Sequence, residues 1–169
     1  MENIRNRKPI LSTRRNHALE HATLQVLMEK GHPNRLGGMS DPRGFWVLGE
    51  IDPETLFNAV EEARTRLLNG ERELAIHPNC GTNLAAAGVV GGILAWLAML
   101  GMKKNWRDRF DRLANVVTLV TLGLIVAQPL GPKLQQSLTT DANIEGLRAV
   151  QVKRVNHEGM PIHRVTTVS

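Results

Sequence analysis

The chain has 169 residues, which is enough for one small domain with a core of its own and too few for two independent domains. Lys and Arg number 21 against 16 Asp and Glu, and the net charge of +5 suits an anionic partner such as a membrane surface or a nucleic acid. Aromatic residues amount to 4% and Tyr is absent, so the stacking surfaces of single-stranded nucleic-acid binders are missing and we expect no nucleic-acid partner.

The first predicted elements are a short strand and a helix. The run KPILS (8–12) is apolar enough for a strand, and Ser12 or Thr13 is suited to cap a helix after it. Apolar residues then recur at helical spacing up to Gly31, namely Leu19, Ala22, Leu24, Leu27 and Met28. The motif HALEH (17–21) therefore lies near the start of this predicted helix.

Three further elements precede the middle of the chain. Residues 34–51 predict a β-hairpin, because Gly, Asp and Pro supply a turn and apolar residues alternate after it. Residues 52–70 predict a helix with Asp52 as its N-cap, Pro53 at the first position and Gly70 after its end. The segment RELAIHP (72–78) predicts a strand.

Two long apolar runs follow. Residues 84–102 and 113–130 carry no charge, and each is about long enough to cross a hydrocarbon core of roughly 30 Å as a helix. The alternative is a buried core hairpin of a soluble protein, but such helices normally keep a polar stripe, and the rest of the chain is too short to cover both. The sequence therefore predicts a transmembrane helical hairpin.

The C-terminal segment returns to strand patterns. Residues 147–155 and 162–168 alternate apolar with polar side chains around a turn, and we expect these two strands to complete the sheet begun in the first half. The predicted fold class is α+β, with a two-layer α/β domain in the order strand, helix, two strands, helix, strands. Residues 1–83 and 131–169 together form that domain, and residues 84–130 form the inserted transmembrane hairpin.

The membrane orientation is left open by two opposing indications. The loop between the apolar runs is rich in basic residues, so the positive-inside rule places it in the cytoplasm and both termini outside. These residues are Lys103, Lys104, Arg107, Arg109 and Arg112. The basic segment 1–83 carries no secretory signal, however, which favours a cytoplasmic α/β domain. We expect a multi-pass protein of the cell membrane with that domain in the cytoplasm.

The motif HALEH contains the candidate metal ligands. His17 and His21 project from one face of a helix at the separation that two imidazoles need to bind one ion. Glu20 lies on the same face and is suited to act as a general base on a metal-activated water. The order H-x-x-E-H is the inverse of the commoner zinc motif H-E-x-x-H. The alternative is a helix that carries two surface histidines.

A third ligand is expected from the segment AIHPNCGTN (75–83). Cys80, the single cysteine, directly precedes the first apolar run, and a thiolate at a helix N-terminus is a good ligand for zinc or iron. His77 is the second choice, and Glu71 or Glu73 would supply an oxygen instead. Alternatively the segment is a tight turn, with Asn79 or Thr82 as a helix cap, or a Cys–His nucleophilic pair.

Other polar residues have simpler interpretations. We expect His32, His157 and His163 to be surface or loop residues, because they lie beside Pro or in turns. Arg14 and Arg15 are suited to bind an anionic substrate or lipid headgroups, although a solvated basic helix end explains them equally simply.

The HALEH helix and the element order resemble two groups of metalloenzymes that share a fold: the pitrilysin and mitochondrial processing peptidase group, and S-ribosylhomocysteine lyase. The resemblance implies that His17 and His21 are ligands and that Glu20 matches the peptidase base. In the peptidases the third ligand is a glutamate, whereas in the lyase it is a cysteine, the role that falls to Cys80 here. Other substrate-binding motifs of these groups are not recognisable, so substrate and reaction do not transfer.

Nearly the whole chain, including SDPRGFW, ELAIHPNCGTN and AQPLGP, resembles a family of bacterial membrane proteins with a domain of unknown function. Together these observations predict a membrane-anchored metallohydrolase, peptidase-like, with zinc or iron as its metal. The alternative is a non-catalytic membrane assembly or scaffolding factor. Expected partners are membrane lipid and a membrane protein that contacts the hairpin.

Overall fold

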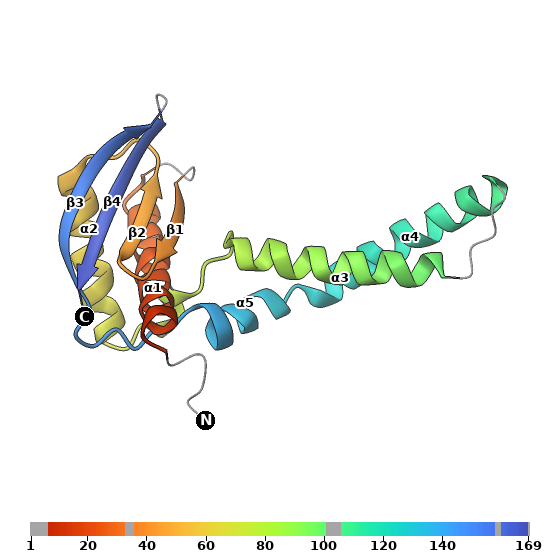
Figure 1. Ribbon diagram of the computed structural model, residues 1–169, viewed down its shortest axis with the longest axis horizontal. Coiled ribbons are helices and arrows are strands. Elements are labelled where there is room, and N and C mark those ends of the chain that lie inside the picture. The colour runs from red at the N-terminus through yellow and green to blue at the C-terminus, as the bar shows by residue number, and fades with distance from the viewer. Residues whose placement is uncertain (1–6, 33–35, 101–105, 158–159, 169) are drawn as a thin grey trace. The chain divides into compact units, whose positions relative to one another are not determined.

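Figure 1 shows a computed structural model of the chain, which describes residues 7–32, 36–100, 106–157 and 160–168. The chain divides into two compact units. The first comprises Met1–His77 and Gln136–Ser169, and the second comprises Pro78–Gln135. The prediction had placed the corresponding boundaries at residues 84 and 130.

The first unit contains two long helices and a four-stranded sheet. Its α-helices are α1 (Lys8–Glu29) and α2 (Pro53–Leu68), and its strands are β1 (Gly37–Asp41), β2 (Gly44–Leu48), β3 (Arg148–His157) and β4 (Met160–Val168). All strand pairs are antiparallel, and the sheet order is β1-β2-β4-β3. Both helices pack on one face of the sheet (Figure 1). The expected α+β class is therefore confirmed.

The C-terminal strands join the sheet through the β1–β2 hairpin. The hairpin β1–β2 forms as expected, and β4 pairs with β2 so that Phe45 lies opposite Val165. Gly44 adopts a φ of +142°, and a Cβ at this position would collide with the carbonyl oxygen of Val165. Residues from the two ends of the chain thus share one sheet, as the strand patterns predicted.

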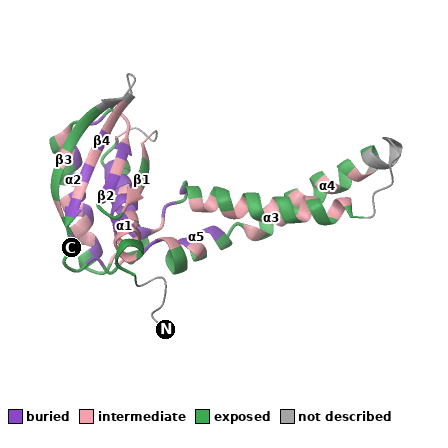
Figure 2. Ribbon diagram, viewed as in Figure 1, coloured by how far each residue is buried: buried purple, intermediate pink, exposed green. Residues whose placement is uncertain are grey.

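The core lies between this sheet and the two helices. Leu19 and Leu27 of α1 are fully buried, as are Phe45 and Val165 of the sheet, and all four belong to one hydrophobic cluster. Figure 2 shows buried segments in purple on the helices and on the sheet. Burying one such aliphatic side chain contributes roughly 1.5–3 kcal/mol to the free energy of unfolding. Because α1 is the central element of this core, the side chains on its polar face are held in fixed positions.

Buried polar side chains fix α1 further. Asn16 donates to the carbonyl oxygen of Asp41 at 2.8 Å and accepts from the Thr167 hydroxyl at 2.7 Å. Gln25 donates to the carbonyl oxygens of Leu74 and Ile76, at 3.1 and 2.8 Å. These bonds connect α1 to the sheet at one end and to the segment before the second unit at the other.

The strand predicted at KPILS is wrong. These residues form the first turns of α1, which begins at Lys8 and has neither Ser12 nor Thr13 as its cap. Pro9 is tolerated in the first turn of a helix because the N–H that it lacks would have no helical partner there. The Thr13 hydroxyl instead donates to the carbonyl oxygen of Pro9 at 2.8 Å.

The strand predicted at RELAIHP is also wrong. Arg72–Ala75 form one turn of 3₁₀-helix. The carbonyl oxygens of Leu74, Ala75 and Ile76 accept hydrogen bonds from side chains of α1, so this segment turns towards the helix and does not join the sheet ladder. The α2 prediction, by contrast, is confirmed, because Asp52 Oδ2 accepts from the Thr55 N–H at 3.0 Å.

The second unit is built from α3 (Gly81–Met99), α4 (Trp106–Ala127) and the short α5 (Leu130–Leu134). The helices α3 and α4 pack against each other, with Gly91 against Val120 and Gly123 against Leu94. Arg112 donates to the carbonyl oxygen of Leu100 at 2.7 Å, beyond the end of α3. Of the predicted basic loop, Lys103 and Lys104 lie outside the described residues.

One described helix, Gly81–Met99, is by itself long and apolar enough to cross a membrane. The second apolar run meets the same criteria only as a bent pair, Arg112–Ala127 with Leu130–Thr139, whose two parts differ in direction by 52°. The bend coincides with Pro129 and Pro132, which interrupt helical hydrogen bonding. Of the two helices of the predicted transmembrane hairpin, one therefore meets the criteria alone and the other meets them only as part of a bent pair.

Candidate metal centre

His17 and His21 lie one turn apart on α1, as the motif predicted. Their ring centroids are 4.2 Å apart, His21 is buried and His17 is half-buried. The two imidazoles therefore lie on one face of a helix that the core holds rigidly. The alternative of two surface histidines does not describe them, because His21 is only 2% exposed.

Backbone carbonyl groups orient both rings. His17 Nδ1 lies 3.0 Å from the carbonyl oxygen of Thr139, and His21 Nδ1 lies 2.8 Å from that of Ala75. A carbonyl oxygen can only accept, so in each neutral ring Nδ1 carries the hydrogen and Nε2 keeps the lone pair. Metal-ligating histidines in proteins are oriented in the same way, by a bond from the other ring nitrogen to a backbone carbonyl or a carboxylate.

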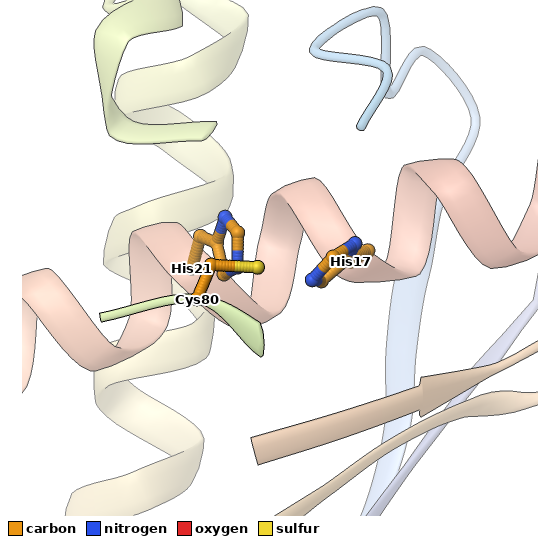
Figure 3. Close-up of side chains that lie close together, drawn as sticks. All are labelled: His17, His21 and Cys80. Carbon is orange, nitrogen blue, oxygen red and sulfur yellow. The ribbon is translucent and has the colours of Figure 1, made fainter. Parts of the chain in front are cut away.

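Cys80 lies close to both histidines. One nitrogen of each ring and the sulfur of Cys80 all lie within 4.8 Å of one another (Figure 3). Cys80 is buried, and its sulfur accepts from the N–H of Thr82 at 3.5 Å at the beginning of α3.

The other proposed third ligands do not belong to this group. The His77 ring centroid is 5.6 Å from that of His21, and among the described residues the group that can hold a metal ion contains Cys80 and not His77. Glu71 forms an ion pair with Arg66 of α2 at 2.8 Å, and Glu73 is exposed. Of the alternatives that the sequence offered, Cys80 is the residue that this group contains.

Glu20 is buried against β1. Its Oε2 accepts a hydrogen bond from the Ser40 hydroxyl, and its carboxyl group occupies the space that a Cβ at Gly38 would need. The carboxylate is therefore held between α1 and the edge strand. Neither Gly38 nor Ser40 was singled out by sequence reasoning, because a contact between a helix and a strand 20 residues away leaves no local pattern.

An open groove reaches His17. Its volume is about 420 Å³, and apart from His17 it is lined by Pro9, Ile10, Thr13, Arg14, Pro42 and Thr139. Four of these residues come from the first turns of α1, and two of the four, Pro9 and Ile10, lie in the segment KPILS that the sequence had assigned to a strand. The groove makes one of the two histidines accessible from the surface.

The prediction that His163 is a surface residue is wrong. It lies on the inner face of β4, opposite Val47, and is fully buried. Both of its ring nitrogens are buried, and this burial lowers the pKa of the imidazole, with a further contribution from the positive charge of Arg154. His163 is thus a neutral core residue and belongs to no metal group among the described residues.

A family model and an uncharacterised relative each match most of the chain. Residues 12–152 match a domain of unknown function, DUF6391. The chain is 35% identical, over 94% of its own length and 80% of the relative's, to an uncharacterised protein of Picosynechococcus sp. (strain ATCC 27264 / PCC 7002 / PR-6). No solved structure gives a significant match. Because the matched region covers most of the chain, the protein belongs to the DUF6391 family.

Proposed function

We propose that this protein is a membrane-anchored metallohydrolase of peptidase type, in which His17, His21 and Cys80 hold a zinc or iron ion. The observation that carries the proposal is the pair of bonds from Nδ1 of the two histidines to the carbonyl oxygens of Thr139 and Ala75. Two rings oriented in this way keep their Nε2 lone pairs for a ligand. A helix that carried histidines only for packing would not need both rings oriented alike.

The donor set fits zinc. Two imidazole nitrogens and one thiolate are soft to intermediate ligands, and three protein ligands leave the fourth tetrahedral position for water or substrate, as in catalytic zinc sites. A divalent ion in this place supplies Lewis-acid chemistry, because it polarises a carbonyl oxygen and acidifies water. The same donor set accepts iron(II), which is why the metal is given as zinc or iron.

Glu20 is the proposed base. It precedes His21 on α1, so it is on the element that carries both histidines, and it accepts a hydrogen bond from Ser40. As the residue that matches the peptidase base, its carboxylate would take a proton from the attacking water and give it to the leaving group. The hydrogen bond from Ser40 holds the carboxylate in one orientation without preventing that exchange.

The hairpin of the second unit is the proposed membrane anchor. No residue of α3 is buried, and large apolar side chains are exposed along both helices. They include Leu84, Val89, Ile93, Trp96, Leu113, Val117, Leu122 and Val126. Soluble proteins rarely expose so much contiguous apolar surface, whereas lipid tails accept it without cost. We therefore place the protein in the cell membrane, with lipid as one partner.

Metal analysis of the full chain tests the proposal. Protein purified in detergent without chelator is expected to contain about one zinc or iron ion per chain, and the double variant His17→Ala/His21→Ala is expected to contain none. His32→Ala is the matched control, because it removes an imidazole that belongs to no metal group among the described residues. Wild-type protein without metal after such a purification overturns the proposal.

A second function, a non-catalytic assembly or scaffolding factor, is favoured by one feature of α3. A Cβ at Gly88 or Gly92 would meet no neighbouring atom within 4 Å, whereas Gly91 and Gly123 are packed within the hairpin. A helix face of small residues that α4 leaves open is suited to contact a helix of another membrane protein. This function predicts that Glu20→Gln leaves the protein fully functional in cells and that a partner co-purifies with it.

A further inference from the structure

A second, polar cavity lies on the first unit. Its volume is about 380 Å³, and its lining includes Arg14 of α1, Arg72 of the 3₁₀ turn and the segment Thr140–Asn143. Pockets that bind small molecules begin at about 300 Å³. The cavity is therefore large enough for a charged group together with part of the molecule that bears it.

The charges around this cavity are not balanced. Arg14 donates to the carbonyl oxygen of Thr140 at 2.8 Å, but its Nε is buried without a hydrogen-bond partner, and it forms no ion pair with a described residue. Arg72 is exposed and likewise has no ion pair within the described part of the chain. Asp141, the acidic residue of the lining, has Arg15 at 3.9 Å. Two arginine charges thus remain for a ligand.

The cavity shares backbone with the proposed metal site. The consecutive carbonyl groups of Thr139 and Thr140 accept from His17 and from Arg14, which lie one helical turn apart on α1. Ala75, whose carbonyl oxygen accepts from His21, lines the cavity. Arg14 also lines the groove that reaches His17. A molecule bound by Arg14 therefore lies next to the histidines.

We infer that Arg14 and Arg72 bind an anionic group, a carboxylate or a phosphate, of the molecule on which the metal site acts. The planar guanidinium group is suited to both, since its N–H groups form paired, charge-assisted hydrogen bonds with either oxyanion. The buried Nε of Arg14 gains in this way the partner that it lacks. That the bound molecule is a substrate of the metal site rests on the proposed hydrolase function, whereas the anion site itself does not need the metal.

Isothermal titration of the full chain in detergent, after removal of metal with a chelator, tests the inference. Inorganic phosphate, succinate and dihexanoyl phosphatidic acid are the probes for a phosphate, a carboxylate and a lipid headgroup, and the tightest binder identifies the source of the anion. Arg72→Gln is expected to weaken binding of that probe about tenfold, which is the effect of losing one charge-assisted hydrogen bond. Arg72 is exposed, so this variant is expected to fold, and Arg14→Gln provides a second test.

The control is Lys153→Gln, which removes the same charge from an exposed position on β3. It is expected to bind the probe as tightly as wild type. Equal weakening in Lys153→Gln and Arg72→Gln, or no binding of any probe to the wild type, overturns the inference. Anion binding by a protein that proves to lack metal supports the anion site and removes only the hydrolase function, so the two failures are distinguishable.

Discussion

The Nδ1 atom of His21 lies 2.8 Å from the carbonyl oxygen of Ala75, and this contact determines which nitrogen of the ring keeps a lone pair. Ala75 belongs to the segment that leads from the first unit to Cys80, and only four residues separate Ala75 from the cysteine. The same short segment thus orients His21 and carries Cys80, which are two of the three proposed metal ligands. His17 has the equivalent relationship with Thr139, at 3.0 Å.

The first prediction concerns the tautomers of the two histidines. In metal-free protein at neutral pH, His17 and His21 are expected to carry their hydrogen on Nδ1, because each faces a carbonyl oxygen there. Long-range ¹H–¹⁵N NMR spectra of the imidazole rings distinguish the two tautomers. His32 is the internal control, and its ring is expected to show the mixture typical of an unconstrained histidine. Hydrogen on Nε2 of either motif histidine would refute the proposed orientation.

The second prediction concerns Glu20. The variant Glu20→Gln is expected to retain its metal and to lose about 10²–10⁴-fold in hydrolysis rate, because an amide cannot accept the proton. Turnover of a quenched-fluorescent peptide library by metal-loaded protein is the measurement, with metal content determined on the same sample. Unchanged turnover in the variant contradicts the role of the base. Absence of turnover in metal-loaded wild type contradicts the hydrolase and favours the assembly factor.

The third prediction concerns Gly38, which makes room for the Glu20 carboxyl group. In Gly38→Ala the new methyl group is expected to displace the carboxylate and break its hydrogen bond from Ser40. We expect hydrolysis to fall at least tenfold while metal content stays at the wild-type level. Gly37→Ala is the matched control, because a Cβ there meets only the Leu48 side chain at 3.9 Å. Equal effects of the two substitutions would show that the contact with Glu20 is unimportant.

The fourth prediction concerns the pH dependence of stability. Burial lowers the pKa of His163 in the folded state, whereas the unfolded chain protonates this residue near its ordinary value of about 6.5. The neutral ring is therefore fully compatible with the fold above pH 6.5, and stability falls as the pH drops below that value towards the folded pKa. The slope from this residue is at most about 1.4 kcal/mol per pH unit.

Denaturant unfolding of wild type and His163→Leu between pH 5 and pH 8 measures this slope. Leucine fills a similar volume without a titratable group, so the variant is expected to lose the component of the slope that begins near pH 6.5. Identical profiles for wild type and His163→Leu would mean that the buried ring does not titrate in this range.

The fifth prediction concerns the membrane. The wild-type protein is expected to stay with membranes during alkaline carbonate extraction, because its apolar hairpin is held by lipid. The double variant Val89→Lys/Ile93→Lys places two charges near the centre of α3 on exposed positions, at a cost of about 2.5–3.5 kcal/mol each for membrane insertion. It is expected to appear in the soluble or aggregated fraction. Extraction of the wild type by carbonate contradicts the anchor.

Local sequence patterns were sufficient for much of the fold. The β1–β2 hairpin has a turn of Asp, Pro and Gly between alternating residues, and α2 has Asp52 and Pro53 at its start, so local chemistry determines both. The joining of the C-terminal strands to the β1–β2 hairpin in one sheet also followed, because neither half of the chain has enough strands for a stable sheet. Of the two wrong strands, KPILS is a short apolar run, and RELAIHP has only three apolar residues in a row, Leu74, Ala75 and Ile76. In segments this short, helix and strand patterns are indistinguishable.

The candidate site could be predicted only in part. The spacing of His17 and His21 identifies a helix face, and the choice of Cys80 followed from its residue type. The contacts that orient these groups were out of reach, since Thr139 and Ala75 act through backbone carbonyls, which every residue type has. The sequence also did not show that His163 is buried. In β4 the faces with Ile162 and Arg164 or with His163 and Val165 are equally apolar, so alternation alone does not show which is inside.

The most direct test of the central claim is the absorption spectrum of the full chain after replacement of its metal by Co²⁺. Cys80 is the single cysteine, so any thiolate-to-cobalt charge-transfer band must come from it. We predict one bound Co²⁺ per chain with such a band and with the ligand-field intensity of a tetrahedral site. Cys80→Ser is predicted to lose the band, and His17→Ala/His21→Ala to lose the bound ion. Bound Co²⁺ without a thiolate band, or no bound Co²⁺, would contradict a metal site formed by His17, His21 and Cys80.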